Sequence, residues 1–484
     1  MPPKSVFTWP SYFTRMNDVD PDHRQMALFD LSRFLQSTEC PSLLPDEDKV
    51  VETIKKCFGP SEHNSEVHSH SVKILPLLFS KLQSRSRDGV LALLAKNVWD
   101  TIPTATKEDL PAIRDNASMA LKTLTDAIPD TQRENMIIMT ASLLPGLKSA
   151  EAKIRCEVDE VFIEVIRRFG TFLPAAHLEE IQRVSVQDLN GDTNLRKRAA
   201  ALLATVCMFT VDAKFAEVVE ITVQGLSRET GDRLRRYILL CTSIARAAGA
   251  RFAGSVQRVI PLLLKELGRL NGLDDEAKES HEANETREQI LQAFECFVMR
   301  CPNFVTGLLP EMLAASASLI KWDPNYCDDG DAGDFDLEED ADDADAGLDD
   351  DDSSWKVRKA AARLVKQTLL THGNALRLVV DQFFNLSNPL LVSRLNERIE
   401  TVRLEIFEIL RRVVELSCVV SDAPPVQDAL GDFVGGSFRV ATDIRPEANS
   451  LVQLQDQLVR TLIHSANHKS QKIKIASIAM LHDL

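Results

Sequence analysis

The sequence repeats one short pattern ten times along its length. In a typical copy an apolar residue precedes a basic one and a small or apolar residue follows three positions later, as in Leu195, Arg196 and Ala199. Apolar residues at helical spacing continue each copy, which predicts an amphipathic helix. One such helix pair cannot bury its own apolar stripe, so the copies must stack on one another. The chain of 484 residues is therefore predicted to be a repeat array, since a single core stops growing at about 250–300 residues.

The basic residue of each copy is called its anchor here. The ten anchors are Arg24, His68, Arg114, Arg155, Arg196, Arg235, Arg287, Arg358, Arg403 and Lys474. Uninterrupted spacings run from 39 residues (196 to 235) to 46 (68 to 114), and three longer gaps contain polar or acidic inserts. A helical period of about 40–47 residues is typical of HEAT and armadillo repeats. We predict an all-α fold, a right-handed α-solenoid of about ten HEAT-type helix pairs with a disordered acidic insertion.

The predicted boundaries follow from the gaps between anchors. They are about seven repeats in 1–322, an acidic loop in 323–352, repeats in 353–420, a Pro- and Gly-containing insert or linker in 421–450, and an incomplete repeat in 451–484. Each anchor is predicted to reach an acidic group in the preceding turn or repeat. Such a ladder is structural, and each exposed rung contributes about 0–1 kcal/mol.

The acidic tract at 323–352 holds 16 Asp and Glu and no Lys, Arg or His. The chain has a net charge of −16, so the rest of the sequence is electrically balanced. We predict that the tract is a solvated loop, because it cannot bury enough apolar surface to offset its ordering entropy. It is either a solubilising segment or a tethered polyanion for a basic partner surface. The candidate partner-binding residues are Asp328, Asp329, Asp331, Asp334, Asp336, Glu338, Glu339, Asp340, Asp349, Asp350, Asp351 and Asp352.

Composition argues against several other classes. Balanced charge outside the tract and an aromatic content of 6% do not favour a nucleic-acid binder. No stretch approaches about 18 uncharged apolar residues, so no membrane span is predicted. The nine cysteines include no CxxC pair, which is typical of reduced thiols in the cytoplasm or nucleus.

No constellation of residues predicts catalysis, a metal or a cofactor. His63, His68 and His70 are spaced so that three imidazoles cannot share one helix face. Residues 325–336 faintly resemble a calcium loop, but a cysteine replaces one carboxylate ligand and an aspartate stands where a bidentate glutamate is expected. The motifs GxxxxGK[ST], GxGxxG and GxSxG are absent. We predict a binding protein and not an enzyme.

Two strings that flank the acidic tract carry a specific family resemblance. KWDPNY at 321–326 precedes the tract and SWKVRKAA at 354–361 follows it. Together they resemble the acidic-loop repeat of the cullin-associated neddylation-dissociated (CAND) family. Further similar segments, in the family's order, are LRKR at 195–198, 244–263, AFECFV at 293–298 and RCP at 300–302. The resemblance covers nearly the whole chain, more loosely over 1–83.

This resemblance implies a HEAT solenoid that regulates cullin–RING ubiquitin ligases. In the family, the N-terminal arm wraps the C-terminal region of an unneddylated cullin and its RING-box subunit and so blocks neddylation. The C-terminal arm displaces the adaptor, so that substrate receptors exchange. The chain is too short for both arms and resembles the N-terminal part. It ends inside the second helix of its predicted tenth repeat, so it is either a fragment or half of a stack that another chain continues.

Two rival functions remain open at this point. An importin-type nuclear transport receptor is also a HEAT solenoid, and its acidic loop can bind basic cargo. A phosphatase-type scaffold shares the fold as well, although the long inserts weigh against uniform scaffold repeats.

Overall fold

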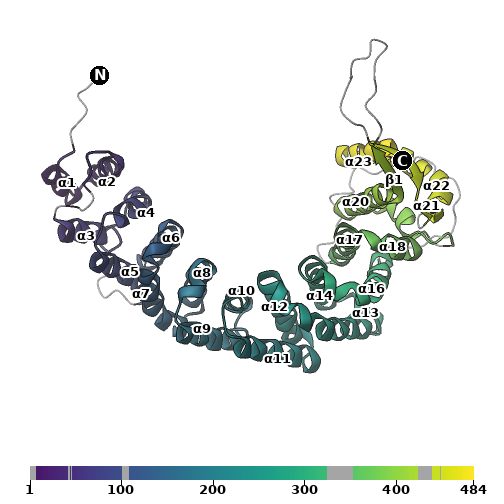
Figure 1. The fold of residues 1–484 in the computed structure, drawn as a ribbon, viewed down its shortest axis with the longest axis horizontal. Coiled ribbons are helices and arrows are strands. Elements are labelled where there is room, and N and C mark those ends of the chain that lie inside the picture. Colours follow the sequence, from purple (N-terminus) through teal and green to yellow (C-terminus); the bar gives the residue numbers. More distant parts are fainter. Residues whose placement is uncertain are drawn as a thin grey trace, which may run out of the picture. The chain divides into compact units, whose positions relative to one another are not determined.

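The computed structural model describes residues 7–41, 44, 46–100, 108–323, 353–387, 389–422, 439–446 and 449–483. The chain divides into two compact units, Met1–Val218 and Val219–Leu484, and the division falls within helix α11 (Asp212–Arg228). Each unit is a stack of antiparallel helix pairs, as Figure 1 shows. The predicted helical solenoid is confirmed.

Unit 1 contains five complete pairs of described helices. They are α1 (Trp9–Met16) with α2 (Pro21–Gln36), α3 (Glu47–Lys56) with α4 (Ser65–Phe79), α5 (Ser84–Trp99) with α6 (Leu110–Ala127), α7 (Glu134–Leu143) with α8 (Ala152–Phe169), and α9 (Ala175–Asp188) with α10 (Thr193–Val206).

Unit 2 continues the same scheme through five further pairs. They are α11 with the first half of α12 (Gly231–Asn271), the second half of α12 with α14 (His281–Arg300), α16 (Leu309–Lys321) with α17 (Ser354–Thr371), α18 (Leu376–Phe383) with α20 (Glu400–Ser417), and α22 (Gln455–Ala466) with α23 (Gln471–Asp483). Short helices α13 (Asp275–Glu279), α15 (Pro302–Val305), α19 (Leu390–Ser393) and α21 (Asn449–Gln453) lie in the connections.

The ten anchors mark the second helix of each pair. Every anchor lies within its first two turns, from Arg24 in α2 to Lys474 in α23. The residue three positions after the anchor has a relative exposure of 0% in all ten pairs. These residues are Ala27, Ser71, Ala117, Val158, Ala199, Ile238, Ile290, Ala361, Ile406 and Ser477. The sequence pattern thus marks the line along which each second helix packs.

Within each unit the second helices form one continuous layer. In unit 1, α2, α4, α6, α8 and α10 contact one another in that order. In unit 2, α12, α14, α17, α20 and α23 do the same. Several of these helices begin at a capping side chain, for example Asn64, which accepts hydrogen bonds from two backbone amides of α4. Caps and the buried line together fix where each pair begins and how it stacks.

The sixth and seventh pairs are joined without a loop. Helix α12 is continuous for 41 residues except at Ala248, whose φ of −123° and ψ of 40° break it into two helices. The following Gly249 lies against the neighbouring α14, since a Cβ there would come 3.0 Å from the Arg300 carbonyl oxygen. A single kinked residue therefore replaces the loop between the sixth and seventh pairs.

The predicted insert at 421–450 contains structure that was not expected. Strands β1 (Cys418–Asp422) and β2 (Arg439–Ile444) pair antiparallel, with an irregularity between Val419 and Val420. The expectation that strands are lacking is wrong here. The two strands carry β-branched residues in CVVSD and RVATDI, which favour extended backbone, whereas the Pro and Gly residues lie between them.

The segment Pro302–Lys321 is long and apolar enough to cross a membrane by composition alone, with a mean hydropathy of 1.3. In the structure it forms α15, a short 3-10 turn and α16. Leu309, Met312 and Leu313 of α16 are buried. Packing as the first helix of the eighth pair accounts for its apolar composition.

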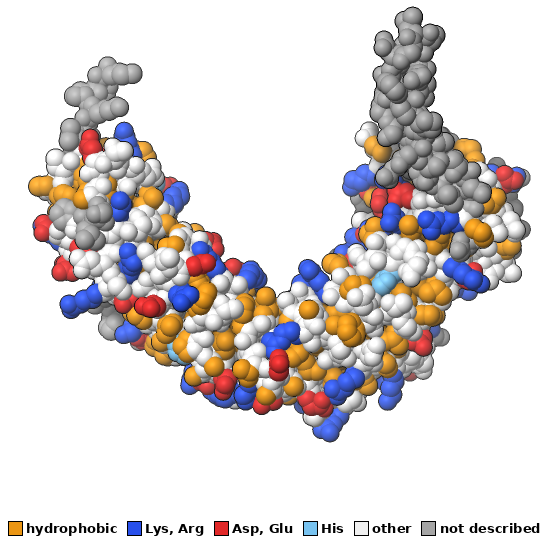
Figure 2. Space-filling view, viewed as in Figure 1, with side chains coloured by type: hydrophobic (Ala, Val, Ile, Leu, Met, Phe, Trp, Pro, Cys, Tyr) orange, Lys and Arg blue, Asp and Glu red, His pale blue; other side chains and the backbone are white. Residues whose placement is uncertain are grey.

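Charged side chains of both signs are interspersed over the face of each unit shown in Figure 2. Some of them link second helices. Glu160 of α8 accepts from Lys122 of α6 at 2.6 Å and lies 2.7 Å from the guanidinium of Arg198 in α10. The interspersed charges agree with the balanced count outside the acidic tract.

Candidate functional site at the root of the acidic insertion

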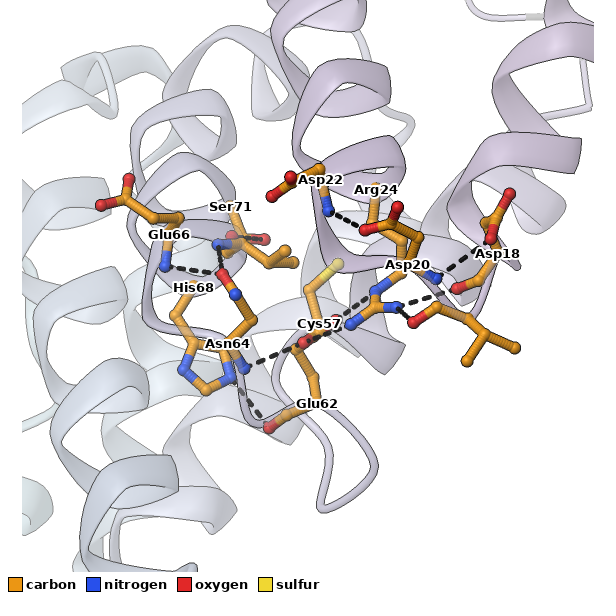
Figure 3. A network of polar contacts seen from close by, with 12 residues as sticks. Asp18, Asp20, Asp22, Arg24, Cys57, Glu62, Asn64, Glu66, His68 and Ser71 are labelled. Carbon is orange, nitrogen blue, oxygen red and sulfur yellow. Dashed lines mark hydrogen bonds and ion pairs between the residues drawn. The ribbon is translucent and has the colours of Figure 1, made fainter.

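The anchors form a ladder whose first rung is drawn in Figure 3. The Arg24 guanidinium donates to the carbonyl oxygens of Asp18 and Val19 at 2.8 Å and makes two 2.8 Å bonds to the Glu62 carboxylate. Burial alone would raise the pKa of Glu62, but the bonds from Arg24 and from the Asn64 amide outweigh it and lower that pKa. The rung therefore joins the loop of its own pair to the loop of the next.

The fourth anchor repeats this arrangement. Arg155 donates to the carbonyls of Ser149 and Ala150 in its own connection, and its Nε lies 3.3 Å from Asp188 in the following pair. The prediction that anchors reach acidic groups in the preceding turn or repeat is therefore wrong for Arg24 and Arg155, whose carboxylate partners come from the next pair. It is confirmed for Arg235, which lies 3.2 Å from Asp232 in the preceding turn.

Two anchors on either side of the acidic insertion are fully buried. Arg287 has an exposure of 0% and contacts no described carboxylate. It donates to the carbonyls of Leu270 and Lys278 at 2.9 and 2.7 Å, and to the Asn284 side-chain oxygen at 2.9 Å. Its guanidinium also lies 4.6 Å from the ring of Trp322, the residue just before the tract. Burial lowers the pKa of Arg287 to about 10.

Asp323 is the first residue of the acidic tract, and its side chain is only 1% exposed. Its carboxylate lies 3.1 Å from Arg398, 3.4 Å from Arg358 and 3.8 Å from Arg394. Glu397 also faces this cluster, at 3.2 Å from Arg358. The expectation of a solvated loop beginning at residue 323 is therefore wrong for Asp323, because three arginine side chains hold it in the protein.

The two ends of the insertion meet on one side chain. The same Nη1 of Arg358 that faces Asp323 donates to the Ser354 hydroxyl at 2.9 Å. The adjacent Ser353 hydroxyl accepts from Asn284 at 3.1 Å, and Asn284 in turn bonds to Arg287. Both buried anchors thus bind the chain where the insertion leaves the solenoid and where it returns. Among the described residues, Arg358, Arg394 and Arg398 surround the carboxylates of Asp323 and Glu397.

The twelve candidate partner-binding residues, Asp328 to Asp352, lie outside the described residues. The structure describes the root alone, and sequence analysis missed most of that root. Arg358 was recognised as an anchor, but Arg394 and Arg398 lie in a later connection with no pattern of their own. The KWD string was noted only as part of a resemblance, whereas its tryptophan and aspartate are the residues that hold the root.

The three histidines weighed as metal ligands separate in the structure. His63 lies 3.3 Å from Asp109, His68 is buried and bonds to the Glu62 carbonyl, and His70 bonds to the Glu66 carbonyl. Among the described residues there is no group of three potential metal ligands. The eight described cysteines are free thiols.

Comparison with known proteins finds similarity to cullin-associated proteins. The cullin-associated NEDD8-dissociated protein 1 of Drosophila melanogaster is 28% identical over 434 residues, covering 87% of this chain and 32% of the fly protein. The Dictyostelium discoideum protein of the same name is 25% identical over 97% of this chain and 37% of its own length. This chain is similar in sequence to cullin-associated NEDD8-dissociated proteins. It spans about a third of the length of these relatives.

The C-terminal part of cullin-associated NEDD8-dissociated protein 1 from Emericella nidulans is 29% identical over 169 residues, or 29% of this chain and 16% of that protein. No family model matches the chain.

Solved structures support the fold. Karyopherin Kap121p aligns over 98% of this chain and 41% of its own with a TM-score of 0.54 and 13% identity. Kap95, solved in a complex with Nup1, aligns over 98% of this chain and 51% of its own with a TM-score of 0.56 and 11% identity. At this identity the likeness shows a shared helical solenoid.

Proposed function

We propose that this CAND relative is a binding arm that regulates cullin–RING ubiquitin ligases. The observation that carries the proposal is the sequence similarity to cullin-associated proteins over 87–97% of the chain. The specific strings on both sides of the acidic tract add to it, because the structure uses their residues to hold the root of the insertion. The proposed location, cytoplasm and nucleus, fits the free thiols.

The proposed mechanism is steric. The arm wraps the C-terminal region of the unneddylated cullin and its RING-box subunit and so covers the site of neddylation. The continuous layer of second helices in each unit supplies an extended surface of interspersed charge, which suits a protein partner. Together with a C-terminal half, the arm promotes exchange of substrate receptors.

The acidic tract has a separate role in this proposal. It contacts a basic surface of the cullin or RING subunit and speeds the encounter, as charge steering raises association rates by about 10–10³-fold. The buried root supports this role because it fixes the point from which 15 further acidic residues extend. The effect weakens with salt, since the screening length is about 8 Å at physiological ionic strength.

Binding to a purified cullin–RING pair tests the function. Interferometry would compare the unmodified and neddylated pairs, with and without the C-terminal half of a CAND protein. Binding that is confined to the unmodified pair is the expected result. Absence of binding in every combination would contradict the proposal, and binding to a GTP-loaded small GTPase would then favour the transport-receptor alternative.

A deletion tests the acidic tract independently. Residues 324–352 would be replaced by a short Gly-Ser linker, which leaves Asp323, Ser353 and Ser354 in place. We expect the association rate at low salt to fall at least tenfold, with the dissociation rate little changed. An association rate equal to that of the complete chain would refute the role of the tract while leaving cullin binding intact.

A further inference from the structure

A groove lies between α14 and α17, on the second-helix layer of unit 2. Its volume is about 220 Å³, below the roughly 300–1,000 Å³ of typical small-molecule sites. Glu288 and Glu295 line one wall, and Trp355, Lys356 and Lys359 line the other. A cavity of this size suits a protruding side chain of a protein segment and is too small for a cofactor.

The repeat itself explains why the groove is present here. Two positions after the anchor, the pairs carry Met26, His70, Asn116, Glu157, Arg198, Tyr237, Gln289, Ala360, Glu405 and Ala476. Ala360 of the eighth pair is thus one of only two small residues at a position that is otherwise long. It is 5% exposed and lines the groove. Its side chain is a single methyl group, shorter than the residues that the preceding and following pairs carry at this position, Gln289 and Glu405.

Trp355 also differs in type from the residues at the same repeat position in the other pairs. Three positions before the anchor, the pairs carry Pro21, Ser65, Pro111, Ala152, Thr193, Asp232, Asn284, Trp355, Glu400 and Gln471. The first turn of a helix favours proline and small or polar residues, so stacking gives no reason for an indole. Trp355 is half-buried and lines the open end of the groove. Half-buried tryptophans are favoured anchors of protein interfaces.

The basic residues that line the groove differ in whether they form an ion pair with a described carboxylate. Arg363 and Glu295 pair at 3.1 Å and close one end. No described carboxylate forms an ion pair with Lys356 or Lys359, although both lie near Glu288 and lower its pKa against the larger, opposite effect of burial. The sixth pair also has two basic residues at these positions, but there Arg233 and Arg236 pair with acids of adjacent turns.

We propose that this groove binds an anionic segment of a partner protein, with one apolar side chain over Ala360 beside Trp355 and carboxylates on Lys356 and Lys359. Glu288 and Glu295 on the opposite wall confine the carboxylates of the segment to the side of Lys356 and Lys359, and a volume of about 220 Å³ admits one side chain of a protein segment. The assignment stands apart from the cullin proposal, because it needs no particular partner.

Peptide display tests the groove directly. A random dodecapeptide library would be selected on the complete chain, and a leading peptide labelled with fluorescein would be measured by anisotropy. We expect selected sequences with an apolar residue flanked by Asp or Glu. Binding should weaken at least tenfold in Trp355→Ala and in the double variant Lys356→Glu/Lys359→Glu.

Two further variants separate the groove from folding and from general charge. Ala360→Gln fills the groove with the residue that the preceding pair carries at the same position, and it should also weaken binding at least tenfold. The matched control Lys153→Glu/Lys197→Glu makes the same charge change at equivalent repeat positions in unit 1. It should leave the affinity within twofold.

Three results would overturn the proposal. One is selection of peptides without acidic residues, and another is equal binding by the wild type and the Trp355→Ala or Ala360→Gln variants. The third is binding that occurs only after residues 324–352 are replaced by a Gly-Ser linker, because the acidic tract of this chain would then be the occupant.

Discussion

Asp323→Asn should loosen the root of the acidic insertion without changing its shape. The substitution removes the negative charge that faces Arg358, Arg394 and Arg398 at 3.1–3.8 Å, whereas Glu397 keeps its contacts with Arg358 and Arg394. Removing one partner of a buried ion pair costs about 3–5 kcal/mol, because the other charge stays buried.

The local contacts reduce this cost. Arg358, at 0% exposure, keeps Glu397 at 3.2 Å and the Ser354 hydroxyl at 2.9 Å. Arg398 is 45% exposed, so water can replace the contact that it loses. We therefore expect a loss of about 2–3 kcal/mol in the local stability around α17, below the full value for a buried pair. At about 1.4 kcal/mol for each factor of ten, local opening should become about 30- to 150-fold more frequent.

Amide hydrogen exchange measures this opening by segment. Peptides from α17 and from the start of α20 should exchange faster in Asp323→Asn, whereas those from unit 1 should not change. Asp340→Asn is the matched control, because it makes the same charge change inside the tract and should leave exchange unaltered. Exchange of α17 within twofold of the wild type would refute the claim that Asp323 holds the root.

Three other perturbations test the repeat framework. Burial raises the pKa of Asp159 well above 3.8, so folding binds a proton that the unfolded chain releases, and wild-type stability should fall as pH rises from about 4. In Asp159→Asn the urea midpoint of unfolding should change less over that range, and parallel pH curves would contradict this cause. Glu160→Gln removes the ion pairs that link three second helices. It should lower the free energy of unfolding, measured by chemical denaturation, by at most about 1 kcal/mol, and it should have no effect in 1 M salt. Gly225→Ala would place a Cβ 2.3 Å from the Tyr237 ring and should lower the unfolding free energy by about 1–3 kcal/mol, whereas Gly254→Ala, with nothing within 4 Å, should not.

The repeat made most of the fold predictable. Each pair repeats the same local requirement, a basic residue in the first turns and a residue without exposure three positions later, so one pattern locates every second helix. The hairpin at 418–444 was not predicted, because the Pro and Gly residues of this segment indicate a linker, whereas the β-branched runs that form the strands are short. The break at Ala248 was not predicted, because the apolar periodicity continues across it. Only the backbone angles show that α12 consists of two helices.

The candidate site was less predictable, for a physical reason. A count of charges treats Asp323 as one of 16 equivalent acids in a solvated tract. Its burial depends on Arg394 and Arg398, which lie more than 70 residues further along the chain and approach Asp323 only in the folded stack. The partners of the anchors were unpredictable for a similar reason. Stacking decides whether a carboxylate comes from the next pair, as for Arg24 and Arg155, or from the preceding turn, as for Arg235.

A repeat array offers an internal comparison that a globular domain lacks. Features shared by all pairs, such as the buried line of small and apolar residues, are what stacking requires, so they say little about partners. Features confined to one pair need another explanation. The eighth pair has two of them: the buried root at Asp323 and an indole in the first turn of its second helix, Trp355. Neither is needed to stack α17 between α14 and α20, since the other pairs stack without them. These differences are the reason for placing the proposed groove in this pair.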